Sequence, residues 1–182
     1  MKKKKICIIT SCRAEYGILK KLIIRLKQSK RFITNLLVTG THLSPKYGNT
    51  FRNIENDGVG IDYKIKIDFK KTDKFSIVKD MSKYLNKFSN AFKKINPSLI
   101  IISGDRYEIL CAAISANIIR IPIVHIHGGE TTFGSYDDNM RHAITKLSNL
   151  HFVSTDKYRT RVIQMGENPR SVFNVGSLGV EN

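Results

Sequence analysis

The sequence lacks tryptophan and has only three cysteines and four prolines among its 182 residues. Cys7, Cys12 and Cys111 are odd in number, form no C-x-x-C pair and have no histidine beside them at metal-ligand spacing. These features exclude a disulfide framework and a cysteine zinc site. We expect Cys7 and Cys111 to be small core residues, and we predict a protein of the reducing cytoplasm.

The sequence also lacks a long apolar segment. Its longest apolar runs, such as 99–102, are far shorter than the roughly 20 residues that span a membrane. Residues 1–5 have the basic character of a signal-peptide start, but Thr10, Ser11 and Arg13 interrupt the apolar stretch that follows. We therefore predict a soluble chain with no membrane partner, in which this stretch forms the first strand.

Acidic residues are few and unevenly placed. The chain has 31 Lys and Arg against 15 Asp and Glu, a formal charge of +16. Residues 1–96 hold 23 basic and 7 acidic residues, whereas residues 97–182 hold 8 of each. A nucleic-acid-binding module is one interpretation of such charge. We favour lysine-rich, solvated helix faces and expect no nucleic-acid partner, because no recognition motif is present and Phe88 and Phe92 fall on a predicted core stripe.

Apolar, β-rich runs alternate with helical patterns along the chain, which is typical of a parallel sheet covered by helices. The predicted fold class is therefore α/β, with a Rossmann-like parallel sheet flanked by helices. The predicted strands are 5–10, 32–38, 61–67, 99–103, 121–126, 151–154 and 172–175, and the predicted helices lie near 16–29, 49–56, 74–95, 106–119, 138–149 and 156–165. The clearest helix carries a stripe at spacings of three and four, which we expect to pack in the core: Val78, Met81, Leu85, Phe88, Phe92 and Ile95.

Ligands of such sheets bind beyond the carboxyl ends of the strands, near the switch in strand order. Four of the predicted strands end in polar segments, at 11–17, 39–42, 103–106 and 125–130. Neither G-x-G-x-x-G nor G-x-x-x-x-G-K-[ST] occurs, so the sequence does not favour a dinucleotide or an ATP site.

Arg13 and Asp105 each allow two interpretations. Arg13 lies just before a predicted helix, where a guanidinium and backbone N–H groups can bind a phosphate, although a surface ion pair is equally compatible. Asp105 follows a predicted central strand, where it either caps the next helix or serves as an active-site carboxylate.

Four of the five histidines fall within 125–151, among several carboxylates. A metal site is one interpretation, but the spacing matches no H-E-x-x-H or related pattern, and we expect no metal. A capped, ion-paired helix that begins near Asp137 is another. The density of titratable groups favours general acid/base chemistry, with two glycines that let the backbone approach a ligand. The residues are His125, His127, Gly128, Gly129, Glu130, Asp137, Asp138, Arg141, His142 and His151.

Five motifs occur in a fixed order along nearly the whole chain. They are RAEYG at 13–17, TGTHLSP at 39–45, GDRYE at 104–108, HIHGGE at 125–130 and DDNMRHAITKLS at 137–148. Together they resemble the hydrolysing UDP-N-acetylglucosamine 2-epimerases of sialic-acid and related nonulosonic-acid synthesis.

The resemblance implies the two-domain GT-B fold, in which two Rossmann-like halves enclose a nucleotide sugar. On this basis we expect residues 1–175 to form the N-terminal Rossmann-like domain. Residues 176–182 would begin the crossover to a second domain that is absent from this chain. We then expect the isolated chain to be inactive and the full-length protein to be a homo-oligomer.

The implied reaction converts UDP-N-acetylglucosamine and water to N-acetylmannosamine and UDP, the first step of sialic-acid synthesis. It proceeds by anti elimination to 2-acetamidoglucal and then hydration, and it requires no cofactor. By resemblance, the catalytic candidates are Asp105, Glu130 and Asp137. Non-hydrolysing relatives carry glutamate at the position of His127, so His127 could share the duty of Glu130. The substrate-binding candidates are Arg13, His42, Arg106, His125, His127, Gly128, Gly129, Arg141 and His142.

Two alternatives stay open at this point. The same reaction could act on UDP-N,N'-diacetylbacillosamine for legionaminic acid. The chain could also be a nucleotide-sugar-binding fragment without catalysis.

Overall fold

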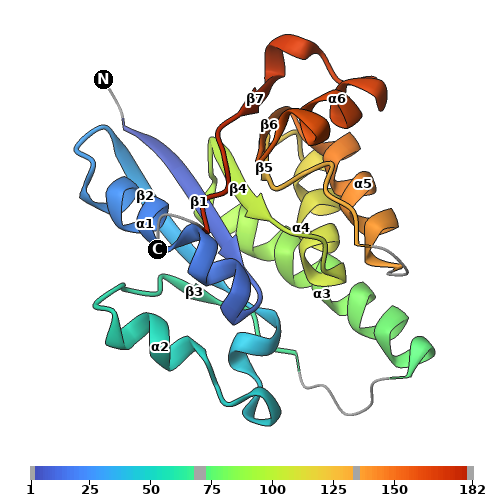
Figure 1. Ribbon diagram of the computed structural model, residues 1–182. Coiled ribbons are helices and arrows are strands. Elements are labelled where there is room, and N and C mark those ends of the chain that lie inside the picture. Colours follow the sequence, from blue (N-terminus) through green and yellow to red (C-terminus); the bar gives the residue numbers. More distant parts are fainter. Residues whose placement is uncertain (1–2, 68–72, 133–135, 180–182) are drawn as a thin grey trace.

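A computed structural model of the chain describes residues 3–67, 73–132 and 136–179. Within them, parallel strands form one sheet in the order β3-β2-β1-β4-β5-β6-β7, with helices on both faces (Figure 1). The predicted α/β class with a Rossmann-like sheet is confirmed. The strands are β1 (Lys4–Thr10), β2 (Phe32–Val38), β3 (Tyr63–Lys64), β4 (Leu99–Ser103), β5 (Ile123–Ile126), β6 (Leu150–Val153) and β7 (Val172–Asn174). The helices are α1 (Arg13–Gln28), α2 (Phe51–Asn56), α3 (Lys74–Ile95), α4 (Tyr107–Ile118), α5 (Asp137–Leu147) and α6 (Asp156–Gln164), and 3-10 turns cover Gly40–Leu43, Pro45–Tyr47 and Pro169–Ser171.

The strand order reverses at β1. The chain first adds β2 and β3 on one side of β1 and then returns through α3 to place β4 on the other side. Ile6 of β1 consequently pairs with Thr34 of β2 and with Leu99 of β4. In a doubly wound sheet, this reversal marks the edge at which ligands bind.

Side chains of the central strands alternate between two hydrophobic layers. On one face, Cys7 of β1 and Ile100 of β4 pack against α3 and α4. On the other face, Ile8 and Ile101 pack against α1 and α2. Strands that are buried on both faces read as continuous apolar runs, which is why they were recognisable from sequence. Cys7 and Cys111 are both fully buried, as predicted.

Helix α3 begins and ends at the predicted residues, but its stripe is only partly buried. Phe88, Phe92 and Ile95 are in the core, whereas the prediction for Val78 is wrong, because this side chain is 64% exposed. The helix has 22 residues and is roughly 33 Å long at 1.5 Å per residue. The strands beneath it span only about 17 to 23 Å. Its first turns therefore extend past the sheet.

Strands β3, β5 and β7 are shorter than predicted. The late start of β3 and β5 has local reasons. In β3, the Asp62 carboxylate accepts the Leu36 N–H at 2.7 Å, so a side chain replaces the strand bond there. In β5, Pro122 has no N–H, and the N–H of Ile123 donates to the Asn149 side chain at 2.9 Å. The paired registers begin at Tyr63 and Ile123, although the Asp62 N–H still donates to the Leu36 carbonyl at 3.0 Å and the Ile100 N–H to the Pro122 carbonyl at 2.9 Å.

The segment after β7 turns back onto the sheet. Leu178 packs with the layer that α1 covers, and it lines with Val175 an apolar groove of about 410 Å³ beside Leu22 and Leu26 of α1. Residues 180–182 of the expected crossover lie outside the described residues. In the parts of the chain that the structure describes, every helix is too short or too polar to cross a membrane.

The two faces of α3 give a matched stability test. Phe88 is fully buried and Phe75 is 81% exposed on the same helix. We expect Phe88→Ala to lower the free energy of unfolding by about 3 to 5 kcal/mol, because it removes a large core side chain and leaves a cavity. Phe75→Ala should change it by less than about 0.5 kcal/mol. Urea unfolding of both variants checks this, and equal losses would contradict the packing described.

Candidate active site

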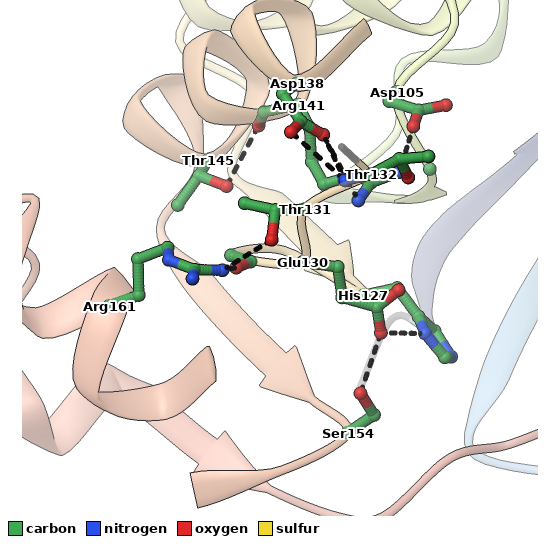
Figure 2. Close-up of polar contacts among 12 residues, drawn as sticks. Asp105, His127, Glu130, Thr131, Thr132, Asp138, Arg141, Thr145, Ser154 and Arg161 are labelled. Carbon is green, nitrogen blue, oxygen red and sulfur yellow. Dashed lines mark hydrogen bonds and ion pairs between the residues drawn. The ribbon is translucent and has the colours of Figure 1, made fainter. Parts of the chain in front are cut away.

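Polar side chains from β4, β5, β6 and α5 meet at the carboxyl edge of the sheet. Asp105 follows β4, His127 and Glu130 follow β5, and Arg141 lies on α5 (Figure 2). These four residues come from three different segments of the chain. All four were predicted from the sequence as site residues. The structure brings them to one edge, as the parallel topology requires.

Asp105 forms an ion pair with Arg141. The Arg141 Nη2 group donates to Oδ2 of Asp105, and its Nη1 atom lies 3.8 Å from Oδ1 of Asp138. Arg141 is only 8% exposed, so its charge needs these carboxylates. Asp105 is not the N-cap of α4, because that position belongs to Arg106. The helix-cap interpretation of Asp105 is therefore wrong.

His127 and Glu130 form a second pair, which Ser154 extends. Nδ1 of His127 lies 2.6 Å from Oε1 of Glu130, and the Ser154 hydroxyl donates to the same oxygen at 2.7 Å (Figure 2). Burial works against ionisation of Glu130, but these two hydrogen bonds outweigh it and hold its pKa below the usual range. The carboxylate therefore stays charged at neutral pH.

Two of the predicted ligand-binding histidines are inside the protein. His125 donates from Nε2 to the Gly104 carbonyl at 3.0 Å and faces the Thr145 hydroxyl at 3.2 Å. His42 lies between the Thr10 hydroxyl at 3.1 Å and that of Thr50 at 2.8 Å.

Burial lowers the pKa of His125 to about 3 and that of His42 to about 4, so both rings are neutral. Both ring nitrogens of each histidine are hydrogen-bonded inside the protein, so the two rings hold the strand exits in position. Their contact with a substrate stays a prediction.

The two glycines after His127 are required by the close packing of this loop. A Cβ on Gly128 would lie 2.9 Å from Nδ1 of His125, and one on Gly129 would lie 2.7 Å from the Val162 side chain. Gly129 also has φ +75°, a conformation that favours glycine. Close packing of the loop against β5 and α6 thus accounts for both residues.

Three further predicted residues lie near the edge with partly or fully exposed side chains. Arg13 is exposed at the first position of α1, where the helix dipole favours anions. His142 is half-buried on α5, and its Nδ1 atom has no hydrogen-bond partner within the described residues. Burial lowers the pKa of His142. Asp137 is the first residue of α5.

Sequence reasoning missed two buried carboxylates. Glu15 accepts the N–H of Ser11 at 2.5 Å and its hydroxyl at 2.8 Å, and Glu108 accepts two bonds from Arg106 at 2.9 and 3.2 Å. Both are at most 5% exposed. Burial raises the pKa of Glu15 to about 7 and also raises that of Glu108. Glu15 lies in the motif RAEYG and Glu108 in the motif GDRYE. The sequence did not indicate that their side chains are buried.

Arg161 of α6 is a third residue that was missed. Its Nη1 group donates to the Gly129 carbonyl at 2.5 Å, and the Thr131 hydroxyl lies 3.4 Å away (Figure 2). This contact ties the loop of Glu130 to α6. Nothing in the sequence pattern signalled it, because an arginine on an amphipathic helix ordinarily faces water.

The titratable groups do not converge on a metal site. Among residues 3–67, 73–132 and 136–179, no three His, Cys, Asp or Glu side chains are arranged to bind a metal ion together. The arrangement instead pairs Asp105 with Arg141, and Glu130 with both His127 and Ser154. Such pairs can bind polar hydroxyl groups and transfer protons.

The sequence of the chain is similar to those of known proteins. The family model described as UDP-N-acetylglucosamine 2-epimerase matches residues 24–182. The chain is 46% identical to the polysialic acid biosynthesis protein P7 of Escherichia coli, over 98% of this chain and 46% of that protein. It is 43% identical to the GDP/UDP-N,N'-diacetylbacillosamine 2-epimerase (hydrolyzing) of Campylobacter jejuni, with the same coverage.

Solved structures show the same fold. A crystal structure of a UDP-N-acetylglucosamine 2-epimerase superposes with a TM-score of 0.87 at 19% identity, over 99% of this chain and 50% of that chain. The Neisseria meningitidis enzyme bound to UDP-GlcNAc superposes with a TM-score of 0.83 at 16% identity, over 97% and 48%. The chain thus spans about half the length of the relatives it matches.

The crowding at Gly128 can be tested against a glycine with room. We expect Gly128→Ala to lower the free energy of unfolding by roughly 1 to 3 kcal/mol, because the new Cβ collides with the fixed His125 ring. Gly17→Ala on α1 is the control, since its Cβ would meet no atom within 4 Å; it should stabilise by roughly 0.5 to 1 kcal/mol. Denaturant unfolding measures both, and a neutral Gly128→Ala would refute the contact.

The raised pKa of Glu15 predicts a pH dependence of stability. An acid whose pKa is raised on folding stabilises the fold fully below its unfolded value of 4.5 and loses that contribution as pH rises through about 7. We expect the wild-type chain to lose about 3 kcal/mol relative to Glu15→Gln across this window, at roughly 1.4 kcal/mol per unit. Unfolding free energies at several pH values check it. A constant difference between the two proteins would show that Glu15 titrates normally.

Proposed function

The chain belongs to the UDP-N-acetylglucosamine 2-epimerase family, and we propose that it is the N-terminal half of a hydrolysing 2-epimerase. The reaction converts UDP-N-acetylglucosamine and water to N-acetylmannosamine and UDP. The observation that carries the proposal is the set of paired acid/base groups at the carboxyl edge, with Asp105 held by Arg141 and Glu130 bonded to His127.

The chemistry of the reaction explains these residue types. Elimination requires a base for the C2 proton and a polar surface for the departing diphosphate, and it gives 2-acetamidoglucal. Hydration then requires an acid that protonates C2 and a base that accepts a proton from water. Carboxylate and imidazole groups perform such transfers near neutral pH. UDP is itself a good leaving group.

We assign acid/base duties to Asp105, Glu130 and Asp137, which follow β4, follow β5 and begin α5. Arg13 and Arg106 lie at two helix N-termini on this edge, where positive charge and free N–H groups suit a diphosphate. Arg141 and His142 of α5 would face the sugar. The second half of the protein would complete the nucleotide site.

The identity of the sugar is the most specific part of the proposal. The Neisseria meningitidis relative, 30% identical over 96% of this chain, is a UDP-N-acetylglucosamine 2-epimerase, which supports UDP-N-acetylglucosamine. UDP-N,N'-diacetylbacillosamine is the second candidate, because relatives at 43% and 39% identity carry that substrate in their names. Both sugars have the 2-acetamido group and UDP leaving group that the mechanism needs.

The test uses a protein of the full family length that begins with this chain. We expect UDP release and N-acetylmannosamine or its diacetylated counterpart with one of the two UDP-sugars. Asp105→Asn should lower kcat by at least 100-fold, the usual scale of an acid/base group. Asp156→Asn is the control: in the described part of the chain the Asp156 side chain accepts a hydrogen bond from Asn174 of β7 at 2.9 Å, and it has no assigned role in the reaction. Wild-type turnover in Asp105→Asn would exclude its assigned role, and no product from either sugar would exclude the function.

A further inference from the structure

His127 adopts an unusual conformation at the end of β5. Its φ of +64° lies in the left-handed region, which residues with a side chain rarely adopt. Its N–H donates to the Phe152 carbonyl of β6 at 2.9 Å, so the backbone is held there. Strained backbone of this kind is concentrated at functional positions.

The side chain of His127 is energetically unfavourable as well as its backbone. Its Nε2 atom is buried and has no hydrogen-bond partner within the described residues, although 12% of the side chain remains exposed. A buried polar atom without a hydrogen-bond partner is energetically unfavourable. The left-handed backbone and the unpaired Nε2 atom both destabilise the fold. Their occurrence on one residue indicates that the His127 ring is placed for function.

The partners of His127 determine which nitrogen carries the proton. Ionised Glu130 can only accept a hydrogen bond, so Nδ1 at 2.6 Å must be the donor. Ser154, the residue after β6, donates its hydroxyl hydrogen to the same Glu130 oxygen and restrains that carboxylate. In the neutral ring, Nε2 then holds a lone pair that is shielded from water.

We propose that Nε2 of His127 accepts the C2 proton of the UDP-sugar in the elimination step, and that Glu130 and Ser154 are its positioning residues. The inference rests on the proposed function and refines it, because the proton acceptor becomes His127 rather than the Glu130 carboxylate. A base, a partner that orients it and a support for that partner recur in proton-transfer sites.

The step balances in atoms and charge. The C2–H bond breaks and an Nε2–H bond forms; the electron pair becomes the second C1–C2 bond, and the C1–O bond breaks with its pair leaving on UDP. Ionised Glu130 stabilises the imidazolium. In hydration, a carboxylic acid of the site protonates C2 from the opposite face, and water gives its hydroxyl to C1 and its proton to a carboxylate. His127 releases its proton to solvent.

The kinetic test uses the full-length protein and separates the two steps. His127→Asn keeps a residue that tolerates the left-handed backbone but cannot accept the proton. We expect UDP release to fall by 100-fold or more with KM changed by less than about five-fold, while added 2-acetamidoglucal is still hydrated within ten-fold of wild type. UDP release at the wild-type rate, or loss of hydration alone, would overturn the inference.

Glu130→Gln gives an independent check through the ring itself. A glutamine can donate to Nδ1 and so favour the Nε2–H tautomer, which should also lower UDP release by 100-fold or more. Long-range proton–nitrogen spectra of the protein labelled with ¹⁵N-histidine should show Nδ1–H in the wild type and Nε2–H in Glu130→Gln. An Nε2–H tautomer in the wild type would overturn the inference even if the protein proved inactive, and inactivity with the expected tautomer would count against the proposed function instead.

His151→Gln is the matched control. His151 is also a buried histidine bonded to a glutamate, with Nε2 3.2 Å from Glu167, but it lies within β6. We expect its variant to release UDP within about three-fold of wild type. Thermal unfolding of every variant shows that each is folded, and a 100-fold loss in folded His151→Gln would show that any buried His–Glu pair has this effect.

Discussion

The burial of β1 and β4 on both faces is the constraint from which the rest of the structure follows. Apolar side chains fill both layers along these strands, so polar groups have no place until the strands end. Because the strands are parallel, those ends share one edge. Polar groups there take partners from neighbouring elements, as in the ion pair of Asp105 with Arg141, whereas Nε2 of His127 has no partner within the described residues.

The same edge contains buried groups in neutral form. His42 and His125 bond to hydroxyls and a carbonyl, and burial lowers the pKa of each below the physiological range. Burial raises the pKa of Glu15 and so favours its protonated form. Neutral groups lose less hydration on burial than ions do, so they can hold strand exits close together where charged groups could not. Among the charged groups of the edge, Arg141 is nearly buried and is paired with Asp105, whereas Arg13 is exposed.

Sequence patterns predicted the fold and the location of the site better than its internal contacts. The limits of α3 were predictable because its apolar spacing stops at Asn96 and Pro97, and the edge was predictable because polar residues follow each apolar run. The partner of Asp105 was not, since it depends on how α5 packs. Glu15 was missed because an acid in the first turn of a helix is ordinarily a solvated partner of the helix dipole. Gly104 packs against this side chain, since a Cβ added at Gly104 would lie 3.5 Å from Oε1 of Glu15.

The contact of Arg161 with the Gly129 carbonyl has a consequence for engineering. The loop that follows β5 carries His127 and Glu130, and its shape depends on α6 through this bond and through Val162. The loop is therefore not a portable unit. A designer who transplants it into another scaffold must carry β6 and α6 with it, or the two side chains will lose their alignment even though every residue of the loop is kept.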